Sequence, residues 1–149
     1  MTRDEFIRVA TEAARTASAR SGLPAGVTVA QAALESRWGE SQLSRRANNF
    51  FGIKAHGKHA WVEMPTTEFF GGSASKVKAK FARYESMAQC FACRDALIAN
   101  GALYLEARTA AKDPEKFIRA LAKRWATDPK YAEKLMKVYA ESGLVELDR

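Results

Sequence analysis

The stretch AALESRWGES, residues 32–41, places one carboxylate, Glu35, among small and apolar residues shortly before a glycine. An expected helix over about residues 25–38 puts Glu35 in its last turn, where the partial negative charge of the helix end disfavours an ionised carboxylate. Packing against Leu34 or Trp38 would act in the same direction, because burial removes a charge from water. An acid that keeps its proton near neutral pH can donate it to a departing glycosidic oxygen. A solvent-facing glutamate near a helix end is the alternative, and spacing alone leaves both interpretations open.

A second carboxylate is available in the segment WVEMPTTEFF, residues 61–70. Most glycosidases use two carboxyl groups, the second as a base, a nucleophile or a stabiliser of positive charge in the sugar ring. Glu63 and Glu68 are the candidates, and Glu68 lies between threonines and aromatic residues. An acid on a hairpin opposite an acid on a rigid helix would enclose a cleft between two lobes. A surface glutamate on a strand is the competing interpretation.

Helical patterns on both sides of this segment supply the elements that position the two acids. Thr2 followed by Glu5 forms a capping box, and apolar residues at helical spacing continue to the stop signal at Ser21-Gly22. A second helix follows at about residues 25–38, with Gly39 as its natural end. Helices resume after Ser86, and two more helix starts are indicated by the Asp-Pro pairs Asp113-Pro114 and Asp128-Pro129.

The middle of the chain has a different pattern, with loop-like sequence from residue 40 followed by a small β-excursion. Lysines alternate with Val77, Ala79 and Phe81, which is typical of a half-exposed strand, and Gly71-Gly72 indicates a hairpin whose partner strand lies in residues 66–70. The lysines either attract an acidic substrate or protect the strand edge against aggregation. They are Lys76, Lys78 and Lys80. The nearby aromatic residues could form a sugar-stacking platform or the core of this lobe, and we expect at least one of them to lie in the core. They are Trp61, Phe69 and Phe70.

Length and charge restrict the class of protein further. A chain of 149 residues suits one domain with a real core. Its net charge of +7 predicts attraction to polyanions, whether nucleic acid, anionic lipid or the acidic polymers of a bacterial wall. No run approaches the roughly 18 apolar residues of a membrane span, so we expect no membrane insertion. The charged start has no signal-peptide pattern, so the chain either stays inside the cell that makes it, is released or delivered by another system, or is a trimmed piece.

Two pairs of residues have the side chains of metal ligands, and neither predicts a metal site. Cys90 and Cys93 lie inside a helical pattern without a second pair, so we interpret them as core-facing residues one turn apart. His56 and His59 lie in a glycine-containing loop without a matching carboxylate cluster, so we interpret them as surface residues. We expect no metal and no cofactor.

Four motifs together resemble the glucosaminidases of glycoside hydrolase family 73, in particular the peptidoglycan-hydrolase domain of the flagellar rod assembly protein. They are AQAALESRWGES, NNFFGIKA, TTEFFGG with KVKAKFARYES, and WATDPKYAEKL. They occur over roughly residues 22–140, in the order of that family and near its spacing. Four motifs in register are much more specific than any one of them.

The resemblance implies an α+β, lysozyme-like fold in which a mostly helical lobe and a small β-hairpin lobe, at about residues 55–84, flank a substrate cleft. It implies a single catalytic domain over residues 1–149 that cleaves β-1,4 glycosidic bonds of the peptidoglycan glycan strand, as an endo-β-N-acetylglucosaminidase. The general acid of the family falls on Glu35. Its second acidic residue, a base or charge stabiliser, falls on Glu68.

The resemblance also implies a set of residues that bind the sugar. The turn over residues 48–54 is expected to shape the floor of the cleft, and an aromatic residue within 125–132 to border the substrate. The substrate-binding residues implied are Gln31, Asn48, Asn49, Phe51, Trp125 and Tyr131. Trp125 replaces the usual tyrosine of the family, so it retains an aromatic face for stacking but lacks the phenolic hydroxyl.

Several alternatives remain open on the sequence alone. The chain could be a non-catalytic peptidoglycan-binding module, or have N-acetylmuramidase specificity on the same fold. Its mechanism could be inverting, retaining or substrate-assisted, and its context a phage lysin, a secreted effector or an excised flagellar domain. A nucleic-acid-binding domain is disfavoured because no nucleic-acid motif is present. We expect a monomer whose partner is the glycan strand, with no nucleic acid bound.

Overall fold

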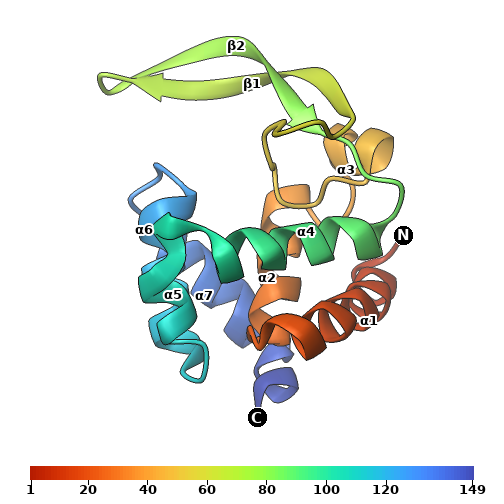
Figure 1. The fold of residues 1–149 in the computed structure, drawn as a ribbon, viewed down its shortest axis with the longest axis vertical. Helices are drawn as coiled ribbons and strands as arrows, with labels where there is room; N and C mark the ends of the chain where they lie inside the picture. The colour runs from red at the N-terminus through yellow and green to blue at the C-terminus, as the bar shows by residue number, and fades with distance from the viewer.

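The helical body and the β-hairpin occupy opposite ends of the molecule in a computed structural model that describes residues 1–149 (Figure 1). The body is built around the helix α2, Ala25–Ser36, whose C-terminal end points toward the hairpin (Figure 1). No helix is both long enough and apolar enough to cross a membrane. The elements in chain order are α1 Arg3–Ser21, α2 Ala25–Ser36, α3 Gln42–Ala47, β1 Trp61–Phe70, β2 Ser73–Ala82, α4 Met87–Asn100, the 3-10 helix η1 Ala102–Tyr104, α5 Leu105–Thr109, α6 Pro114–Trp125, α7 Tyr131–Glu141 and the 3-10 helix η2 Leu144–Asp148.

The central helix, α2, is buried along almost its whole length. It contacts α1, α7 and η2, and its alanine and valine side chains let these neighbours approach closely. The remaining helices enclose the same hydrophobic core. Its fully buried members include Phe6, Val27, Phe91, Phe117 and Leu121. Because α2 is held on several sides, a side chain at its end has a well-defined position.

The predicted starts and ends of the first helices are largely confirmed. Thr2 and Glu5 form both hydrogen bonds of a capping box, and Gly22 ends α1 in the left-handed conformation. The second helix ends at Ser36, two residues before the predicted end, because Arg37 and Trp38 both have positive φ angles, 51° and 58°. This bend places the Trp38 ring against Phe6, with ring centroids 6.0 Å apart. Tertiary packing therefore overrides the helical pattern of residues 37 and 38.

Two further predictions about helices were wrong. Residues 42–47, expected to be loop, form α3 with Ser41 as the N-cap, whose side chain accepts from the Ser44 amide. The last long helix begins at Tyr131 rather than at Pro129. Asp128 accepts from the Lys130 amide at 2.8 Å and so closes a turn just before the helix. The other Asp-Pro pair is confirmed, since Asp113 caps α6 and Pro114 is its first residue.

The predicted hairpin is confirmed and is longer than expected. Strands β1 and β2 pair from Trp61 opposite Ala82 to Phe70 opposite Ser73. The connecting residues Gly71 and Gly72 have φ angles of 56° and 83°, which two-residue hairpin turns require and glycine adopts without strain. As predicted, the lysines are exposed on one face of β2, whereas Phe81 on the other face is buried.

The expected aromatic core of this lobe is absent. Trp61, Phe69 and Phe70 are 51%, 60% and 62% exposed, so the prediction that one of them is buried was wrong. The hairpin projects past the helical body as a two-stranded arm (Figure 1). Met64 and Phe81, near that base, are the hairpin's large buried side chains.

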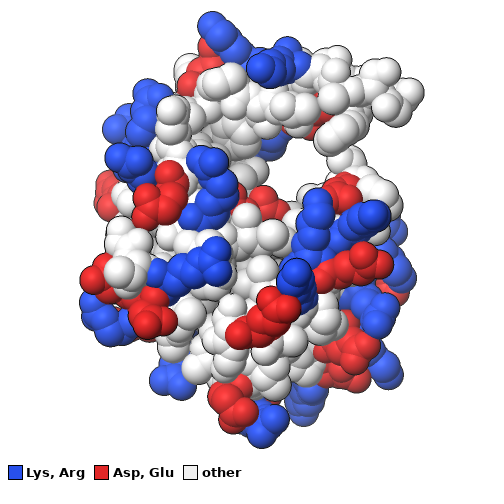
Figure 2. Space-filling view, turned by 180° about the vertical axis from the view of Figure 1, so that it is seen from behind, with Lys and Arg blue, Asp and Glu red and all other residues white.

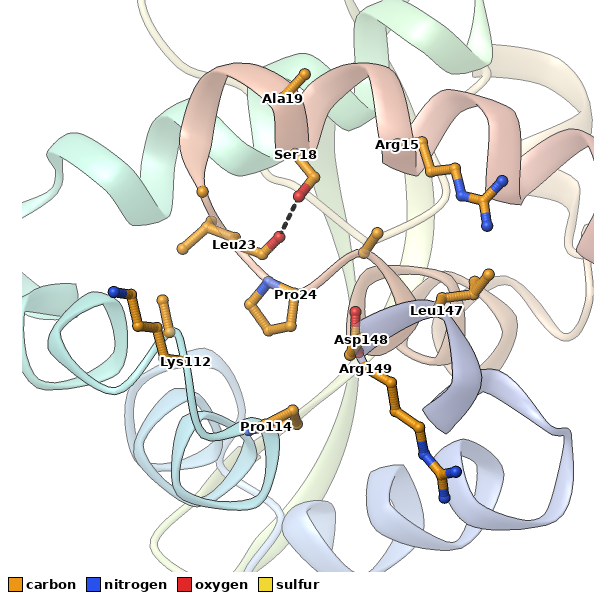
Figure 3. A pocket seen from close by; sticks show the side chains of 13 residues that line it. Arg15, Ser18, Ala19, Leu23, Pro24, Lys112, Pro114, Leu147, Asp148 and Arg149 are labelled. Atoms are coloured by element: carbon orange, nitrogen blue, oxygen red, sulfur yellow. Dashed lines mark hydrogen bonds between the residues drawn. The ribbon is translucent and has the colours of Figure 1, made fainter.

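The buried start of α2 is capped by a residue far along the chain. Pro24 precedes the helix and has no side chain that can accept a hydrogen bond. The Asp148 carboxylate accepts from the amides of Gly26 at 2.8 Å and Val27 at 3.2 Å, and also from the Tyr139 hydroxyl at 2.8 Å. Figure 3 shows Asp148 beside Pro24. Gly26 permits this approach, because a Cβ atom there would overlap the Leu144 carbonyl oxygen.

Removing this cap should destabilise the whole fold. Asp148→Ala leaves two amides at a buried helix start and the Tyr139 hydroxyl without their acceptor. We expect the free energy of unfolding to fall by about 1–2 kcal/mol in urea denaturation. Glu146→Ala is the matched control, because Glu146 is exposed on the same turn and pairs only with Arg149. An equal loss in both variants would contradict the capping role.

Candidate active site

A cleft lies between the hairpin and the helical body. Figure 2 shows the molecule hollowed between these two parts. The cavity has a volume of about 500 Å³ and is lined by residues of α2, the turn after α3, the hairpin, and the α6–α7 connection with the start of α7. Both carboxylates identified in the sequence line it. Its lining residues include Glu35, Phe51, Lys54, Thr66, Thr67, Glu68, Trp125, Asp128, Tyr131 and Lys134.

Glu35 is partly buried in the last turn of α2, where the helix end meets the cleft. Burial raises the pKa of its carboxyl group above the ordinary 4.5, and a hydrogen bond with the Tyr131 side chain, the smaller effect, lowers it. The predicted protonated acid is therefore supported by its surroundings, and the solvent-facing alternative does not fit. A carboxyl group in this environment can act as a proton donor.

Tyr131, the first residue of α7, is the polar neighbour of Glu35. Burial and, next, the nearby Glu35 charge raise the pKa of the Tyr131 phenol well above its ordinary value, so the group keeps its proton. Its oxygen accepts a hydrogen bond from Gln31 Nε2 at 3.1 Å. The phenol can therefore donate its own proton to the Glu35 carboxylate.

Glu68 approaches the cleft from the hairpin and is tied to the body by an ion pair. Lys54 Nζ lies 2.5 Å from Glu68 Oε1 and 5.3 Å from the centre of the Phe81 ring. Lys54 also forms an isolated β-bridge with Phe81, so its backbone is fixed against β2. The side chain of Glu68 is 34% exposed, so substrate can reach it. The two carboxylates thus differ in environment, with one partly buried beside a phenol and the other paired with a lysine.

Aromatic residues form one wall of the cleft. The rings of Phe51 and Trp125 meet edge to face, with centroids 6.5 Å apart. The Trp125 ring also lies beside the Tyr104 ring, with centroids 6.0 Å apart. Trp125 is only partly buried, so part of its indole faces the cavity. Phe51 is 1% exposed and supports this wall from behind. Phe51, Trp125 and Tyr131 of the implied substrate-binding set thus line the cavity.

The other three residues of the implied substrate-binding set do not line the cavity. Gln31 is fully buried and bonds to Tyr131 and Arg94. Asn49 is buried and its amide group donates to the carbonyls of Ile53 and Ala82 at 2.9 Å each. Asn48 ends α3 in the left-handed conformation and donates to the Tyr84 carbonyl. These side-chain amides stabilise the turn and the helix packing. They affect the cleft only by keeping the residues that line it in position.

Sequence reasoning missed four polar groups of the cleft. Thr66 and Thr67 lie on β1 beside Glu68, and Asp128 and Lys134 come from the opposite side. The Lys134 ammonium, 2.6 Å away, and the Lys130 amide lower the pKa of Asp128. All four lie within the TTEFF and WATDPKYAEKL segments, where the sequence pattern indicated Asp128 only as a helix cap.

A second cavity, of about 420 Å³, lies at the far end of α2 and has no comparable chemistry. Arg15, Lys112, Pro114 and Arg149 surround it, together with Asp148 (Figure 3). Because the carboxylate of Asp148 is occupied with capping α2, this cavity has no acid available for proton transfer. The cleft between hairpin and body is therefore the candidate active site.

Comparisons with known proteins agree on one family. Residues 11–144 match the family model Glucosaminidase, described as mannosyl-glycoprotein endo-beta-N-acetylglucosaminidase. The chain is 41% identical over 128 residues to peptidoglycan hydrolase FlgJ of Salmonella typhimurium, and 33% identical over 127 residues to exo-glucosaminidase LytG of Bacillus subtilis. Each alignment covers 82% of this chain, but only 40% and 45% of the respective relative, so the chain spans less than half of either protein.

A solved structure supports the same relationship. The catalytic domain of the autolysin Auto from Listeria monocytogenes superposes with a TM-score of 0.87 and is 31% identical in sequence. The match covers 98% of this chain and 87% of that domain. The predicted α+β fold, with a helical lobe and a hairpin lobe, is therefore confirmed.

Glu35→Gln should stabilise the protein, and the gain should be larger at alkaline than at acid pH. The pKa of Glu35 is raised on folding, so between the ordinary 4.5 and the raised value the folded chain holds a proton that the unfolded chain has released. The wild type consequently loses stability as pH rises through this window, and a neutral glutamine does not.

Thermal unfolding at about pH 4 and about pH 8 measures this difference. Glu133→Gln, at an exposed position of α7, is the matched control and should show no such pH dependence. A Glu35→Gln gain that is the same at both pH values would contradict the raised pKa.

Proposed function

The chain belongs to the glucosaminidase family, and on that basis we propose that it is a glycoside hydrolase that cleaves β-1,4 bonds of peptidoglycan glycan strands, as an endo-β-N-acetylglucosaminidase. The observation that carries this proposal is that two carboxyl groups line the same cleft. Glu35 is partly buried, and Glu68 forms an ion pair with a lysine. Residues 1–149 would form one catalytic domain, active as a monomer on the cell wall after release or delivery by another system.

Glu35 acts as the general acid in this proposal. Burial raises the pKa of its carboxyl group, which favours the protonated form, and the group would donate its proton to the glycosidic oxygen as the bond breaks. The carboxylate left behind is then stabilised by the Tyr131 hydroxyl, because a hydrogen bond to an ionised acceptor is stronger than one to a neutral acceptor. The same surroundings therefore hold the proton before the reaction and stabilise the negative charge after it.

Glu68 would assist an attacking water molecule or stabilise positive charge in the sugar ring. Glu68 belongs to the hairpin, and its ion pair with Lys54 fixes the carboxylate at the wall of the cleft. The 2-acetamido group of the substrate could replace this carboxylate as the nucleophile. In that case Glu68 stabilises charge only, and its loss is partly tolerated.

The cleft surface suits a sugar chain. Trp125 offers an apolar face on which a pyranose ring can stack, and Thr66 and Thr67 supply hydroxyl groups for its polar edge. Lys54 and Lys134 are each paired with a carboxylate of the cleft, so their ammonium groups contribute hydrogen-bond donors there and no excess of positive charge. A non-catalytic binding module would have no need of a partly buried acid, so we favour the hydrolase.

Replacing the two acids separately should give different losses of activity. Glu35→Gln removes the only proton donor proposed and should lower peptidoglycan turnover by at least about 100-fold. Glu68→Gln should leave measurable turnover, because the acetamido group of the substrate can take over. A clearing assay on purified peptidoglycan compares the two variants with Glu63→Gln as the control on the same strand.

Mass spectrometry of the reducing ends in the same digests shows which of the two alternating glycosidic linkages is cut. New N-acetylglucosamine ends support the proposed specificity, whereas new N-acetylmuramic acid ends would show a muramidase on the same fold. Binding without any cleavage by the wild type would establish a wall-binding module instead. Complete and equal loss in both acid variants would contradict substrate assistance and make Glu68 essential.

Lys54 and Glu68 should behave as one unit. Lys54→Met removes the ion pair that orients Glu68, and we expect an about two- to fivefold loss of turnover, in line with a half-exposed pair. In the Glu68→Gln background the same change should have little further effect, because the partner is already neutral. Lys134→Met is the control, since Lys134 pairs with Asp128 and its effect should add to that of Glu68→Gln. Additive losses for Lys54 would contradict the coupling.

A further inference from the structure

Arg94 of α4 is the largest fully buried side chain in the protein. A buried guanidinium group costs stability unless its donors are paired, and an apolar residue of similar volume usually serves packing as well. Asp95 balances the charge at 2.8 Å, with both side chains at most 3% exposed. Even so, Nη2 of Arg94 has no hydrogen-bond partner. The arginine is therefore retained at a cost to the core.

The donors of Arg94 are directed at two residues of α2. Nε donates to Gln31 Oε1 at 2.9 Å, and Nη1 donates to Thr28 Oγ1 at 2.8 Å. The first of these contacts begins a series of hydrogen bonds that leads to the cleft. Gln31 Nε2 lies 3.1 Å from the Tyr131 oxygen. Tyr131 lines the cleft together with Glu35, and the Tyr131 side chain lowers the pKa of Glu35.

The direction of each bond in this series follows from the chemistry of Arg94. A guanidinium group has donors only, so it must meet the carbonyl oxygen of the Gln31 side chain and not its amide nitrogen. The Gln31 amide then points at Tyr131 and donates to the phenol oxygen. The single proton of Tyr131 is left to donate to Glu35. Reversing Gln31 would set two donors against each other at Arg94.

We propose that Arg94 is a positioning residue for the catalytic acid: through Gln31 it fixes the Tyr131 hydroxyl as a donor to the Glu35 carboxylate. This inference rests on the proposed function, in which Glu35 loses its proton at the transition state. The donated bond strengthens as negative charge develops on Glu35, so the series stabilises the transition state more than the ground state.

Other charged groups face Glu35 across the cleft and stay constant in the test. Lys54 and Glu68 come from the turn and the hairpin, and Asp128 and Lys134 from the α6–α7 connection and α7. Their two ion pairs, Lys54 with Glu68 and Lys134 with Asp128, are not touched by changes at Gln31 or Arg94. A change in the titration of Glu35 can then be assigned to the buried series.

Gln31→Glu is the decisive variant. The new carboxylate still accepts from Arg94, so the buried arginine keeps its partner, but it cannot donate to Tyr131. The Tyr131 hydroxyl would turn toward this new carboxylate, and Glu35 would lose its donor. We expect the pKa of Glu35 to rise by about one unit or more, and turnover on the acid side of the profile to fall about 10- to 100-fold. The alkaline limit of activity should move to higher pH.

Two further variants separate the lost donor from the added charge. Tyr131→Phe removes the donor without adding a carboxylate and should raise the pKa of Glu35 in the same direction. Arg94→Lys keeps a cation that can donate to Gln31 and should retain most of the wild-type titration, whereas Arg94→Met should not. Thr28→Val is the matched control, because it removes another buried partner of Arg94 without touching the series and should leave the pKa of Glu35 unchanged.

Carbon-13 NMR titration of glutamate-labelled protein, with the Glu35 signal assigned from Glu35→Gln, measures the pKa without any assay of activity. A shift in Gln31→Glu and Tyr131→Phe but not in Thr28→Val supports the inference. An unchanged Glu35 pKa in folded Gln31→Glu, or an equal shift in Thr28→Val, would overturn it. If the pKa moves as expected while no variant and no wild-type protein cleaves peptidoglycan, the proposed function fails and the positioning role stands.

Discussion

The partial burial of one carboxyl group at the end of α2 is the constraint on which the rest of this structure depends. Glu35 is useful as an acid only if water cannot hydrate its charge fully and if the group points into the cleft. Both conditions require α2 to be held in place along its length. The helix is accordingly packed by α1, α7 and η2, and its uncapped start is satisfied by Asp148, which lies more than a hundred residues away in the chain.

The two sides of the cleft are built on different physical principles. Glu35 belongs to a close-packed helical body, where a polar network with Tyr131 and Gln31 gives it a fixed neighbour. Glu68 belongs to a hairpin whose outer end has few contacts, and its position relies on an ion pair with Lys54. In the proposed function, a rigid acid and a carboxylate on an arm would allow the cleft to admit a polymer from the side while the proton donor stays in place.

Much of this architecture could be read from local patterns, because those patterns have short-range causes. The capping box at Thr2, the cap at Asp113 and the glycine turn at Gly71-Gly72 each act within a few residues, and all three appear as predicted. The failures have long-range causes. Trp38 leaves the helical pattern to pack on Phe6, and Trp61 and Phe69 stay exposed because the arm has no second layer.

The sequence by itself determined the fold class, the hairpin and the two acids, through periodicity, turn residues and motifs that each span only a few positions. Only the tertiary structure decided which polar residues face the cleft. Gln31 and Asn49 looked like sugar-binding amides and are buried, whereas Lys54 turned out to hold Glu68. The role of Arg94 could not be read from its neighbours in the chain, because it depends on the order of donors and acceptors through Gln31 and Tyr131, which three separate helices bring together.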